Sequence, residues 1–477
     1  MNHYTQFFIN GQWVSPADTN AKLLDVIDPS TETAFAQISM GSPVDVDRAV
    51  VAATKAFESY SQTSIGERID LLKKIRDGLE DRREEIAQII SREMGAPITF
   101  ARESQTYTCI AHIDAMMEIL KIYPMEERLG TTLISKEPIG VVGLITPWNW
   151  PLNQVICKVI PAIASGCTVV LKPSEIAPLD ATIFAEILDQ AGLPAGVFNL
   201  VNGDGPCVGD AISRHPDIHM VSFTGSTRAG IQVAKSAADT VKRVTQELGG
   251  KSANIILDDA DIDTAVATGV TVCLSNTGQS CDAPTHMFVP AHSYEKALSV
   301  AANVANNAVL GHPGETNTEL GPLASKMQFD KVQDLIQSGI SQGARLVAGG
   351  LGRPEHLPVG FYAKPTIFAD ANPDMAIVRE EIFGPVLVIS PYDTEEQAIS
   401  AANSSQYGLA AYVQSADINR AQQVAKKLRA GSVFLNYPDW DVMAPFGGYK
   451  QSGNGREGGP HALTEYLEVK ATVGFFA

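Results

Sequence analysis

The stretch NTGQSCDAP, residues 276–284, sets a single cysteine, Cys281, among small and polar residues. It follows a segment with helical character, Thr268 to Ser275, and Gly278 is expected to end that helix. A helix that stops there can hold a thiol in a cleft, where the thiolate form is a nucleophile. Taken alone, a small buried apolar residue is the commoner role of a free cysteine. Cys281 is therefore a candidate nucleophile that needs partners elsewhere in the chain.

Two upstream segments supply such partners. TQELGGK, residues 245–251, carries Glu247 directly before two glycines, where a carboxylate near a thiol can act as a general base on water. TPWNWP, residues 146–151, carries Asn149 between two prolines that fix the backbone, and its amide can donate to an oxyanion. Singly, each is more often a surface carboxylate or a turn-forming amide. Together with the thiol they indicate covalent catalysis at a carbonyl carbon.

These three segments and five further motifs resemble the aldehyde dehydrogenase superfamily, in the family's order and over nearly the whole chain. The motifs are PWN (147–149), KPSE (172–175), FTGS (223–226), ELGGK (247–251), GQSC (278–281), EEIFGPV (380–386), PFGGYK (445–450) and SG (452–453). The resemblance implies the hydrolytic, non-acylating branch with NAD(P) as cofactor, because acylating relatives typically lack the base that Glu247 supplies.

The resemblance also implies roles for the catalytic residues. Cys281 would attack the aldehyde carbon, and the Asn149 amide and the Cys281 backbone N–H would hold the oxyanion. Glu247 would activate the water that hydrolyses the thioester to the carboxylic acid. Lys158 matches a lysine that the family often has there, and a structural role is favoured over a proton relay.

From Ile139 onward the sequence alternates between strand, loop and helix patterns, which predicts βαβ units and a largely parallel sheet. Such sheets bind ligands at the carboxyl ends of their strands. The helix expected after Ser226 can hold a pyrophosphate, although the GxGxxG fingerprint is absent. The predicted cofactor-binding residues are Ile145, Thr146, Pro147, Trp148, Lys172, Ser174, Glu175, Gly205, Phe223, Gly225, Ser226, Leu248, Gly249, Glu381 and Phe383.

By resemblance, Lys172 and Glu175 would hold the adenosine ribose, Glu381 would bind the nicotinamide ribose, and Phe383 would pack near the ring. A carboxylate at the adenosine ribose repels a 2′-phosphate, so Glu175 favours NAD over NADP. Lys172 leaves NADP open as a secondary cofactor.

The predicted substrate-contacting residues are Trp150, Asn153, Gln154, Cys157, Ser280, Asp282, Trp440 and Phe446. Asp282 directly follows the nucleophile, and Asp439 and Asp441 lie in a loop that lines the substrate entrance in relatives. An acidic entrance repels anionic aldehydes, so a neutral or cationic, fairly bulky substrate is expected, with Trp150 and Trp440 as aromatic walls. The alternative is that these aspartates point to solvent or cap turns.

His286 stands where this family usually carries arginine. A histidine is mostly neutral at pH 7, so a local charge pair is expected to be missing. This departure puts local stability in doubt rather than the chemistry.

The expected fold class is α/β and aldehyde dehydrogenase-like. A Rossmann-type, NAD-binding domain is expected over residues 1–120 and 139–246, and an α/β catalytic domain over 247–445. A β-ribbon oligomerisation arm and a C-terminal tail are expected at 121–138 and 460–477. The β-prone tail is expected to pair onto a neighbouring subunit's sheet, in a homodimer or homotetramer.

The amino-terminal region is expected to serve packing. FFINGQWV, residues 7–14, predicts a hairpin with an Asn-Gly turn. Amphipathic helices are expected from Pro43 and from Ile65 to Met94.

Composition limits the remaining classes of function. The net charge of −18 argues against nucleic acid and anionic membranes as partners. Neither a signal peptide nor a membrane-spanning segment is predicted, and the six cysteines show no metal-ligand or disulfide spacing. A cytoplasmic enzyme that acts on a small aldehyde, without a metal, is therefore expected. The rivals are a semialdehyde-specific member of the same family and a non-enzymatic binding protein that retains the fold.

Overall fold

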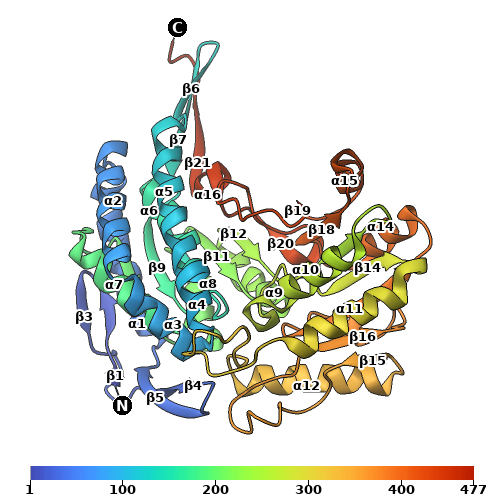
Figure 1. Ribbon diagram of the computed structural model, residues 1–477. Helices are drawn as coiled ribbons and strands as arrows, with labels where there is room; N and C mark the ends of the chain where they lie inside the picture. Colours follow the sequence, from blue (N-terminus) through green and yellow to red (C-terminus); the bar gives the residue numbers. More distant parts are fainter. Residues whose placement is uncertain (1, 477) are drawn as a thin grey trace.

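The larger of two central sheets carries most of the first half of the chain in the computed structural model, which describes residues 2–476 (Figure 1). Its strand order is β20-β12-β11-β8-β9-β10-β2-β3. The strands are β2 (Phe7–Ile9), β3 (Gln12–Val14), β8 (Val141–Ile145), β9 (Thr168–Lys172), β10 (Phe198–Leu200), β11 (Met220–Thr224), β12 (Arg243–Glu247) and β20 (Gly453–Asn454). Strands β8 to β12 are all parallel, as predicted. The predicted hairpin of β2 and β3 is confirmed, with Asn10 and Gly11 at positive φ.

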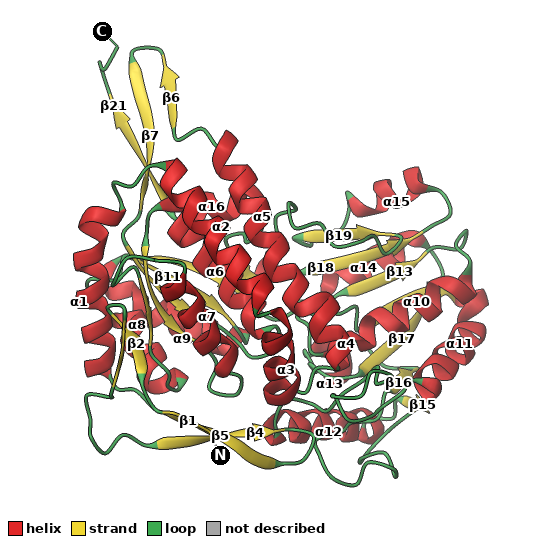
Figure 2. Ribbon diagram, turned by 60° about the vertical axis from the view of Figure 1, so that its left-hand side comes forward, coloured by secondary structure: helices red, strands yellow, loops and turns green. Residues whose placement is uncertain are grey.

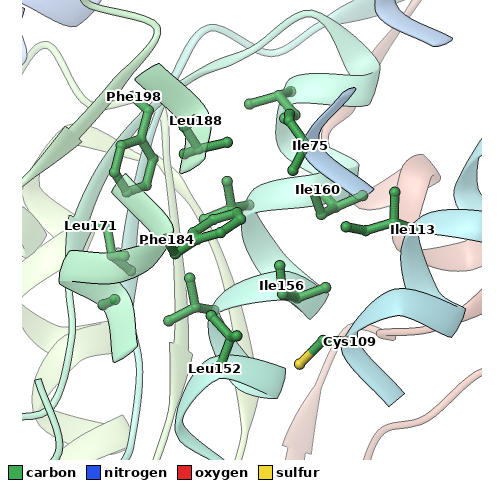
Figure 3. Packing of buried hydrophobic residues seen from close by; sticks show 14 of the residues in the cluster. Ile75, Cys109, Ile113, Leu152, Ile156, Ile160, Leu171, Phe184, Leu188 and Phe198 are labelled. Carbon is green, nitrogen blue, oxygen red and sulfur yellow. The ribbon is translucent and has the colours of Figure 1, made fainter. Parts of the chain in front are cut away.

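Helices cover both faces of this sheet because alternate strand residues point into two different cores. Val142 and Leu144 of β8 belong to the core under α2, α5, α6 and α7, part of which Figure 3 shows. Val141 and Ile145 belong to the core under α1, α8 and α9. The helices are α1 (Pro43–Tyr60), α2 (Ile65–Asp81), α3 (Arg83–Met94), α5 (Thr106–Ile122), α6 (Pro151–Ser165), α7 (Leu179–Gln190), α8 (Asp210–Arg214) and α9 (Thr227–Ala237).

The single helix predicted from Ile65 to Met94 is wrong. The chain leaves helical geometry at Arg82 (φ −104°, ψ 13°), so that α2 and α3 are separate helices. The Arg82 guanidinium binds Glu85 and Glu186, which ties the break to α7. Hydrophobic periodicity continues through the break because both helices bury apolar residues in one core.

The second sheet carries most of the remaining chain, in the order β15-β16-β17-β14-β13-β18-β19 (Figure 2). Its strands are β13 (Ala253–Ile256), β14 (His286–Pro290), β15 (Arg345–Ala348), β16 (Thr366–Ala369), β17 (Val386–Tyr392), β18 (Ala410–Gln414) and β19 (Ser432–Leu435). The surrounding helices are α10 (Ile262–Leu274), α11 (Tyr294–Asn307), α12 (Lys326–Ser341), α13 (Ala376–Arg379), α14 (Glu395–Ser404) and α15 (Ile418–Ala425). Strand β17 begins at Val386 and excludes Phe383, which has a φ of +61° that strands do not adopt. The division expected at residues 246 and 247 falls at the end of β12, and the domain boundaries stay a prediction.

A three-stranded ribbon projects from the body of the molecule (Figures 1 and 2). It consists of β6 (Glu126–Leu129), β7 (Thr132–Pro138) and β21 (Leu467–Thr472) in the order β21-β7-β6. The tail strand β21 pairs antiparallel with β7 of its own chain, where pairing onto a neighbouring subunit's sheet was expected. The outer edges of β21 and β6 have no partner strand in this sheet.

Smaller elements lie outside the two central sheets and the ribbon. A sheet of β1 (Asn2–Tyr4), β5 (Thr33–Ser39) and β4 (Leu23–Asp28) lies near the amino terminus. The short helix α4 (Ile98–Phe100) continues as a π-helical turn at Ala101–Gln105, and α16 (Gly459–Glu465) precedes β21. None of the helices described has both the length and the apolar character that a membrane crossing requires.

Helix α7, which follows the KPSE loop, begins against two fully buried carboxyl groups. Glu93 accepts hydrogen bonds from the backbone N–H groups of Leu179 (2.9 Å) and Asp180 (3.3 Å). Neither side-chain oxygen of Asp180 has a hydrogen-bond donor among the described residues. Burial raises the pKa of both carboxyl groups, that of Asp180 to about 7, and their mutual repulsion raises the pKa of Glu93 further. The pair is therefore most stable when it holds a proton.

A carboxyl group with a raised folded-state pKa contributes stability at low pH and loses it as the pH rises through that pKa. We expect the free energy of unfolding of the parent to fall between about pH 4 and pH 7, because over this range the unfolded carboxyl groups have lost their protons while the folded pair still holds one. The amide of Asp180→Asn is neutral and can donate to Glu93. Over the same pH range, the free energy of unfolding of this variant should fall by roughly 1–3 kcal/mol less than that of the parent. Thermal unfolding across this pH range measures it, with the exposed Asp77→Asn as matched control. An equally steep fall in Asp180→Asn would contradict the assignment.

Candidate active site

The loop that carries Cys281 begins with a left-handed turn. After α10 ends at Leu274, Asn276, Thr277 and Gly278 all have positive φ (54°, 57° and 71°). A Cβ on Gly278 would lie 2.2 Å from the carbonyl oxygen of Gly384, so only glycine fits there. Left-handed geometry costs about 1 kcal/mol or more for each non-glycine residue, so its surroundings must hold this turn in place.

Side-chain amides connect this turn to the loop at residues 146–151. Asn276 Nδ2 donates to the carbonyl oxygen of Asn149 at 2.9 Å, and Gln105 Nε2 donates to Asn276 Oδ1 at 3.3 Å. Asn149 Nδ2 in turn donates to the carbonyl oxygen of Gln279 at 2.9 Å. An amide nitrogen has two N–H donors, so this bond orients the Asn149 side chain and leaves one donor free. The predicted oxyanion donor is thereby held beside the predicted nucleophile.

The Cys281 thiol lies in a partly buried, acidic environment. Burial raises the pKa of this thiol well above its usual value, and Asp282, Glu381 and Glu247 add to the rise. A Cβ on Gly250 would lie 2.3 Å from the Cys281 carbonyl oxygen, which explains the second glycine of ELGGK. The resting group is therefore the thiol, and attack on a carbonyl requires a base.

Glu247 ends strand β12 and is 5% exposed. Neither of its carboxylate oxygens has a hydrogen-bond partner among the described residues, and a Cβ on Gly447 would lie 2.6 Å from Oε1. Burial raises its pKa well above the usual range, the Glu457 carboxylate raises it further, and Lys158 and Arg456 lower it. A buried, unpartnered carboxylate with a raised pKa has the properties of a general base.

A cavity of about 10 Å³, close to what one water molecule needs, lies beside Glu247. It is lined by Cys157, Ser222, Thr245, Glu247, Arg456, Glu457, Ala462, Glu465 and Tyr466. Lys158, fully buried on α6, donates to Ser222 Oγ at 3.0 Å and forms an ion pair with Glu457. The ion pair of Lys158 and Glu457 therefore contributes to the electrostatic environment of Glu247. The sequence did not predict Glu457 as the partner of Lys158.

The predicted adenosine end of the cofactor site lies at the carboxyl ends of β8, β9 and β11. Lys172 Nζ donates to Glu175 Oε2 and to the carbonyl oxygen of Pro173, both at 2.9 Å. Ser226 caps α9 by accepting from the Ala229 N–H at 3.3 Å. The remaining residues predicted here are Ile145 and Thr146 at the end of β8, Ser174 in the loop after β9, Gly205 at the start of a π-helical turn (Gly205–Gly209) after β10, and Phe223 and Gly225 at the end of β11.

The predicted nicotinamide end is built from the ELGGK and EEIFGPV segments. Glu381 accepts from the Gly250 N–H at 2.9 Å, and a Cβ on Gly249 would lie 2.4 Å from a Glu381 carboxylate oxygen. Leu248 N–H donates to the Ser452 carbonyl oxygen at 3.0 Å. The Phe383 ring lies 5.5 Å from the ring of Trp148, the residue after Pro147, in an edge-to-face arrangement. Lys251 and Lys331 lower the pKa of Glu381, against the larger rise caused by burial.

One group of predicted substrate residues lies on the amino-terminal end of α6 and on the nucleophile loop. Trp150 Nε1 donates to Ser280 Oγ at 2.9 Å, and the Trp150 ring packs edge-on against Phe100 at 5.3 Å. Asn153 and Cys157, one helical turn apart, are both partly exposed, whereas Gln154 is buried.

The second group does not form the acidic entrance in the expected way. Asp441 Oδ1 accepts from the Met443 N–H at 2.9 Å and caps a turn, which is the alternative considered for it. Burial raises the pKa of Asp282, and the Tyr412 side chain beside it lowers it. The Trp440 ring lies 5.7 Å from that of Phe446. The two aromatic rings therefore lie next to each other, whereas the aspartates do not form a common acidic surface.

His286 is neutral, as expected for this departure from the family pattern. Its Nε2 lies 2.9 Å from Ser390 Oγ, and its ring lies 4.1 Å from that of Phe288. Burial, and then the charge of Lys251, lower the pKa of His286 to about 3. Lys251 is itself buried without a hydrogen-bond partner among the described residues, and burial lowers its pKa to about 8.

Comparison with known proteins places this site in a family. The model of the aldehyde dehydrogenase family matches residues 13–472. A 3-succinoylsemialdehyde-pyridine dehydrogenase from a Pseudomonas species is 53% identical over 476 residues, which are 100% of this chain and 99% of that protein.

Solved structures agree. A mutant of aldehyde dehydrogenase C from Pseudomonas syringae, in complex with NAD⁺ and octanal, has a TM-score of 0.98 and 52% identity, covering 99% of this chain and 97% of that one. An aldehyde dehydrogenase from Bartonella henselae has a TM-score of 0.97 and 50% identity, covering 99% and 100%. The chain belongs to the aldehyde dehydrogenase family, and it is accordingly an oxidoreductase that acts on aldehydes.

Several residues that shape the site escaped the sequence analysis. Gln105 and Asn276 orient the Asn149 loop, and Glu457 pairs with Lys158. Tyr412 lies beside Asp282. Of these, only Asn276 lies in a quoted motif; the others reach the site from distant segments by tertiary packing. An acidic residue in the glycine-rich run GREGG, residues 455–459, was the one available signal for Glu457.

The charges around Glu247 predict how its activity as a base depends on pH, because only the deprotonated carboxylate can accept a proton. Removing the Glu457 charge in Glu457→Gln should lower the Glu247 pKa, so the acidic limb of the pH–rate profile moves to lower pH. Removing the Lys158 charge in Lys158→Met should move that limb to higher pH, each shift being roughly one unit. Steady-state rates between about pH 5 and pH 9 measure both shifts of the acidic limb. The control is Ser222→Ala, which removes a hydrogen-bond partner of Lys158 without changing a charge. Shifts in the same direction would rule out this electrostatic account.

Proposed function

We propose that this protein oxidises an aldehyde to the carboxylic acid through a Cys281 thioester, with NAD as the hydride acceptor. The observation that carries the proposal is the meeting of three groups in one place. A partly buried thiol, an oriented amide with a free N–H and a carboxylate without a hydrogen-bond partner among the described residues lie on three segments that are far apart in sequence.

The first step is attack on the aldehyde carbon. Burial and the neighbouring carboxyl groups raise the pKa of the Cys281 thiol, so its proton must leave to solvent before Sγ attacks. Sγ then bonds to the carbonyl carbon, whose oxygen takes the electron pair of the broken π bond. The second N–H of the Asn149 amide and the Cys281 backbone N–H donate to this oxygen.

The residues present fit a dinucleotide. Thr146 has a buried hydroxyl without a partner at the carboxyl end of β8, Lys172 and Glu175 are paired in the loop after β9, and the absent Cβ of Gly249 leaves room at Glu381. Lys172 and Glu175 would hold the adenosine ribose, Ser226 a phosphate, and Glu381 the nicotinamide ribose. When bound, NAD supplies the acceptor for the hydride that leaves the carbon attached to Sγ.

Glu247 then serves as the base that hydrolyses the thioester. Its carboxylate takes a proton from a water molecule, whose oxygen bonds to the acyl carbon as the C–S bond breaks. The proton then passes to the leaving sulfur, which restores the thiol and the carboxylate. Lys158 is a positioning residue that lowers the Glu247 pKa rather than a group that reacts. NAD is favoured over NADP because Glu175, held by Lys172, repels a 2′-phosphate.

The substrate is proposed to be a neutral or cationic aldehyde with some bulk. The carboxyl groups beside Cys281 oppose an anionic substrate, and Trp150, Trp440 and Phe446 offer apolar surface. A semialdehyde-specific enzyme is the second candidate, because the Pseudomonas relative at 53% identity is named for a semialdehyde that carries a pyridine.

The ribbon is proposed to join subunits into a homodimer or homotetramer. Among residues 2–476, no strand pairs with either outer edge of the ribbon, and Leu129, Val469, Val473 and Phe475 are between 58% and 80% exposed. Open edges and exposed apolar side chains are typical of a surface that another chain covers.

Absorbance at the reduced-nicotinamide band tests the function directly. The parent should form one NADH for each aldehyde consumed, and Cys281→Ala, which lacks the nucleophile, should lose at least about a thousandfold in rate. Cys281→Ala should still bind NAD in a fluorescence titration, which separates lost chemistry from lost folding. A Cys281→Ala variant that retains the parent rate would exclude the thioester route.

A matched pair of substrates tests the charge preference. We expect an uncharged aldehyde to exceed succinate semialdehyde by about tenfold or more in kcat/KM, because the carboxylate meets like charges beside Cys281. Replacing Asp282 with Asn should narrow the gap, and Asp374→Asn, on the exposed surface, should not. Equal kcat/KM values for the two aldehydes would favour the semialdehyde-specific enzyme.

A further inference from the structure

The helix that begins at Ile98 contains a π-helical turn close to the active site. Helix α4 continues directly into the turn at Ala101–Gln105 and then into α5, and the residues at both ends of the turn keep helical φ and ψ (Figure 1). The Thr106 N–H donates to the Ala101 carbonyl oxygen, five residues back. Such turns are rare, and many of them lie at functional sites. The turn holds one more residue than an α-helical turn, so it rotates the residues that follow it relative to those that precede it.

Two side chains support the π-helical turn. Thr106 Oγ1 donates to the carbonyl oxygens of Ala101 and Arg102, both at 3.0 Å. Arg83 Nη2, on α3, donates to the Arg102 carbonyl oxygen at 2.7 Å. The carbonyl groups of the wider turn therefore have donors, and the surrounding side chains stabilise the turn.

The turn ends at Gln105, which is 1% exposed and directs its amide nitrogen at the catalytic loops. Gln105 Nε2 lies 3.3 Å from Asn276 Oδ1, 3.5 Å from the Asn149 carbonyl oxygen and 3.7 Å from Met94 Sδ. Its Oε1 has no donor among the described residues. A buried amide oxygen without a donor is unfavourable, and a methionine of similar length would avoid it. The bonds that Nε2 makes are therefore what distinguishes glutamine from an apolar residue at this position.

Asn276 connects Gln105 to the oxyanion donor. Asn276 Nδ2 donates to the carbonyl oxygens of Asn149 at 2.9 Å and Gln279 at 3.3 Å. Asn149 Nδ2 donates to the same Gln279 carbonyl oxygen at 2.9 Å. The two ends of an asparagine amide have nearly the same shape, so their hydrogen-bond partners decide which way the amide points. Gln105 donates to Asn276 Oδ1, and it thereby favours the orientation in which Nδ2 holds both carbonyl groups.

Building on the proposed function, we propose that Gln105 is a positioning residue for the oxyanion donor, placed by the π-helical turn and acting on the Asn149 amide through Asn276. Its side chain bonds to Asn276 and to the Asn149 backbone, and among the described residues it makes no hydrogen bond to the nucleophile. The left-handed turn before Cys281 keeps its own support, because Gly278 packs on Gly384. Loss of the Gln105 amide should therefore slow the reaction at the carbonyl carbon without displacing the thiol.

The test replaces Gln105 with Met and uses Gln337→Met, on the exposed side of α12, as the matched control. With NAD and propanal, the first turnover of NADH formation in Gln105→Met should be roughly ten- to a hundredfold slower than in the parent, less than the loss caused by removing an oxyanion donor. The value of kcat should fall while KM for propanal stays within about twofold, as expected for an interaction that acts in the transition state. Gln337→Met should keep the parent rate.

Two further measurements distinguish positioning from a general structural effect. In Asn149→Ala, adding Gln105→Met should lower the rate by less than about twofold more, because the amide that Gln105 positions is already absent. Alkylation of Cys281 by iodoacetamide forms no oxyanion, so its rate in Gln105→Met should stay within about twofold of the parent. Thermal unfolding of Gln105→Met should match the parent, since one unpartnered buried amide oxygen replaces another.

A pair of substitutions at Thr106 tests the turn itself. Thr106→Val removes the hydroxyl that bonds to two carbonyl groups of the turn, and it should slow NADH formation in the same way as Gln105→Met. Thr106→Ser keeps the hydroxyl and should restore the parent rate. The control is Thr54→Val, which removes a hydroxyl bond of 2.9 Å to the Val50 carbonyl oxygen on α1 and should leave the rate unchanged.

The outcomes separate this inference from the proposed function. A parent protein that forms no NADH would overturn the function, and this inference with it. A parent that forms NADH, together with Gln105→Met at the parent rate, would overturn the inference and leave the function standing. Independent, multiplied losses in the double variant would also overturn it, because Gln105 would then act on some other group. So would alkylation of Cys281 that slows as much as aldehyde oxidation, because the thiol itself would have moved.

Discussion

The active site depends on the left-handed turn formed by Asn276, Thr277 and Gly278. This turn redirects the chain from α10 into the nucleophile loop and packs Gly278 directly on the carbonyl group of Gly384. It costs free energy locally, and amide hydrogen bonds from Asn276 to Asn149 and from Gln105 to Asn276 hold it in place. Nucleophile and oxyanion donor are therefore positioned by one network. A change in the turn would displace both, and it would also move the adjoining EEIFGPV segment with Glu381, which is proposed to bind the nicotinamide ribose.

Crowding of acidic groups gives the site its chemistry. Asp282, Glu381 and Glu247 surround the thiol, and burial adds to their effect, so the resting sulfur keeps its proton. The same burial makes Glu247 a stronger base than an exposed carboxylate, while Lys158 limits the rise in its pKa. Lys251 and Lys331 limit the rise in the pKa of Glu381 in the same way. The positive charges of Lys158, Lys251 and Lys331 thus limit the rise in the pKa of both carboxyl groups.

Local sequence patterns predicted the parts of the fold that depend on local physics. The hairpin at residues 7–14, the succession of parallel strands from Val141 and the helix capped by Ser226 follow from turn chemistry and periodicity. The break at Arg82 was missed, because tertiary contacts there override an unbroken apolar pattern. The motif residues Cys281, Asn149 and Glu247 were found as candidates. Gln105, Glu457 and Tyr412 were not, because strands and helices far apart in sequence bring them to the site. Sequence alone also did not determine where the aspartates of the entrance loop point, since Asp441 caps its own turn.

The most direct test of the central claim traps the covalent intermediate. Glu247→Gln keeps the shape of the base but cannot take a proton from water, so hydrolysis should become at least about a hundredfold slower than acylation. Intact-mass measurement after mixing this variant with NAD and propanal should show one added acyl group per chain, located on the peptide that contains Cys281. An unmodified Glu247→Gln protein that has nevertheless formed NADH would contradict the thioester mechanism. So would an acyl group on any residue other than Cys281.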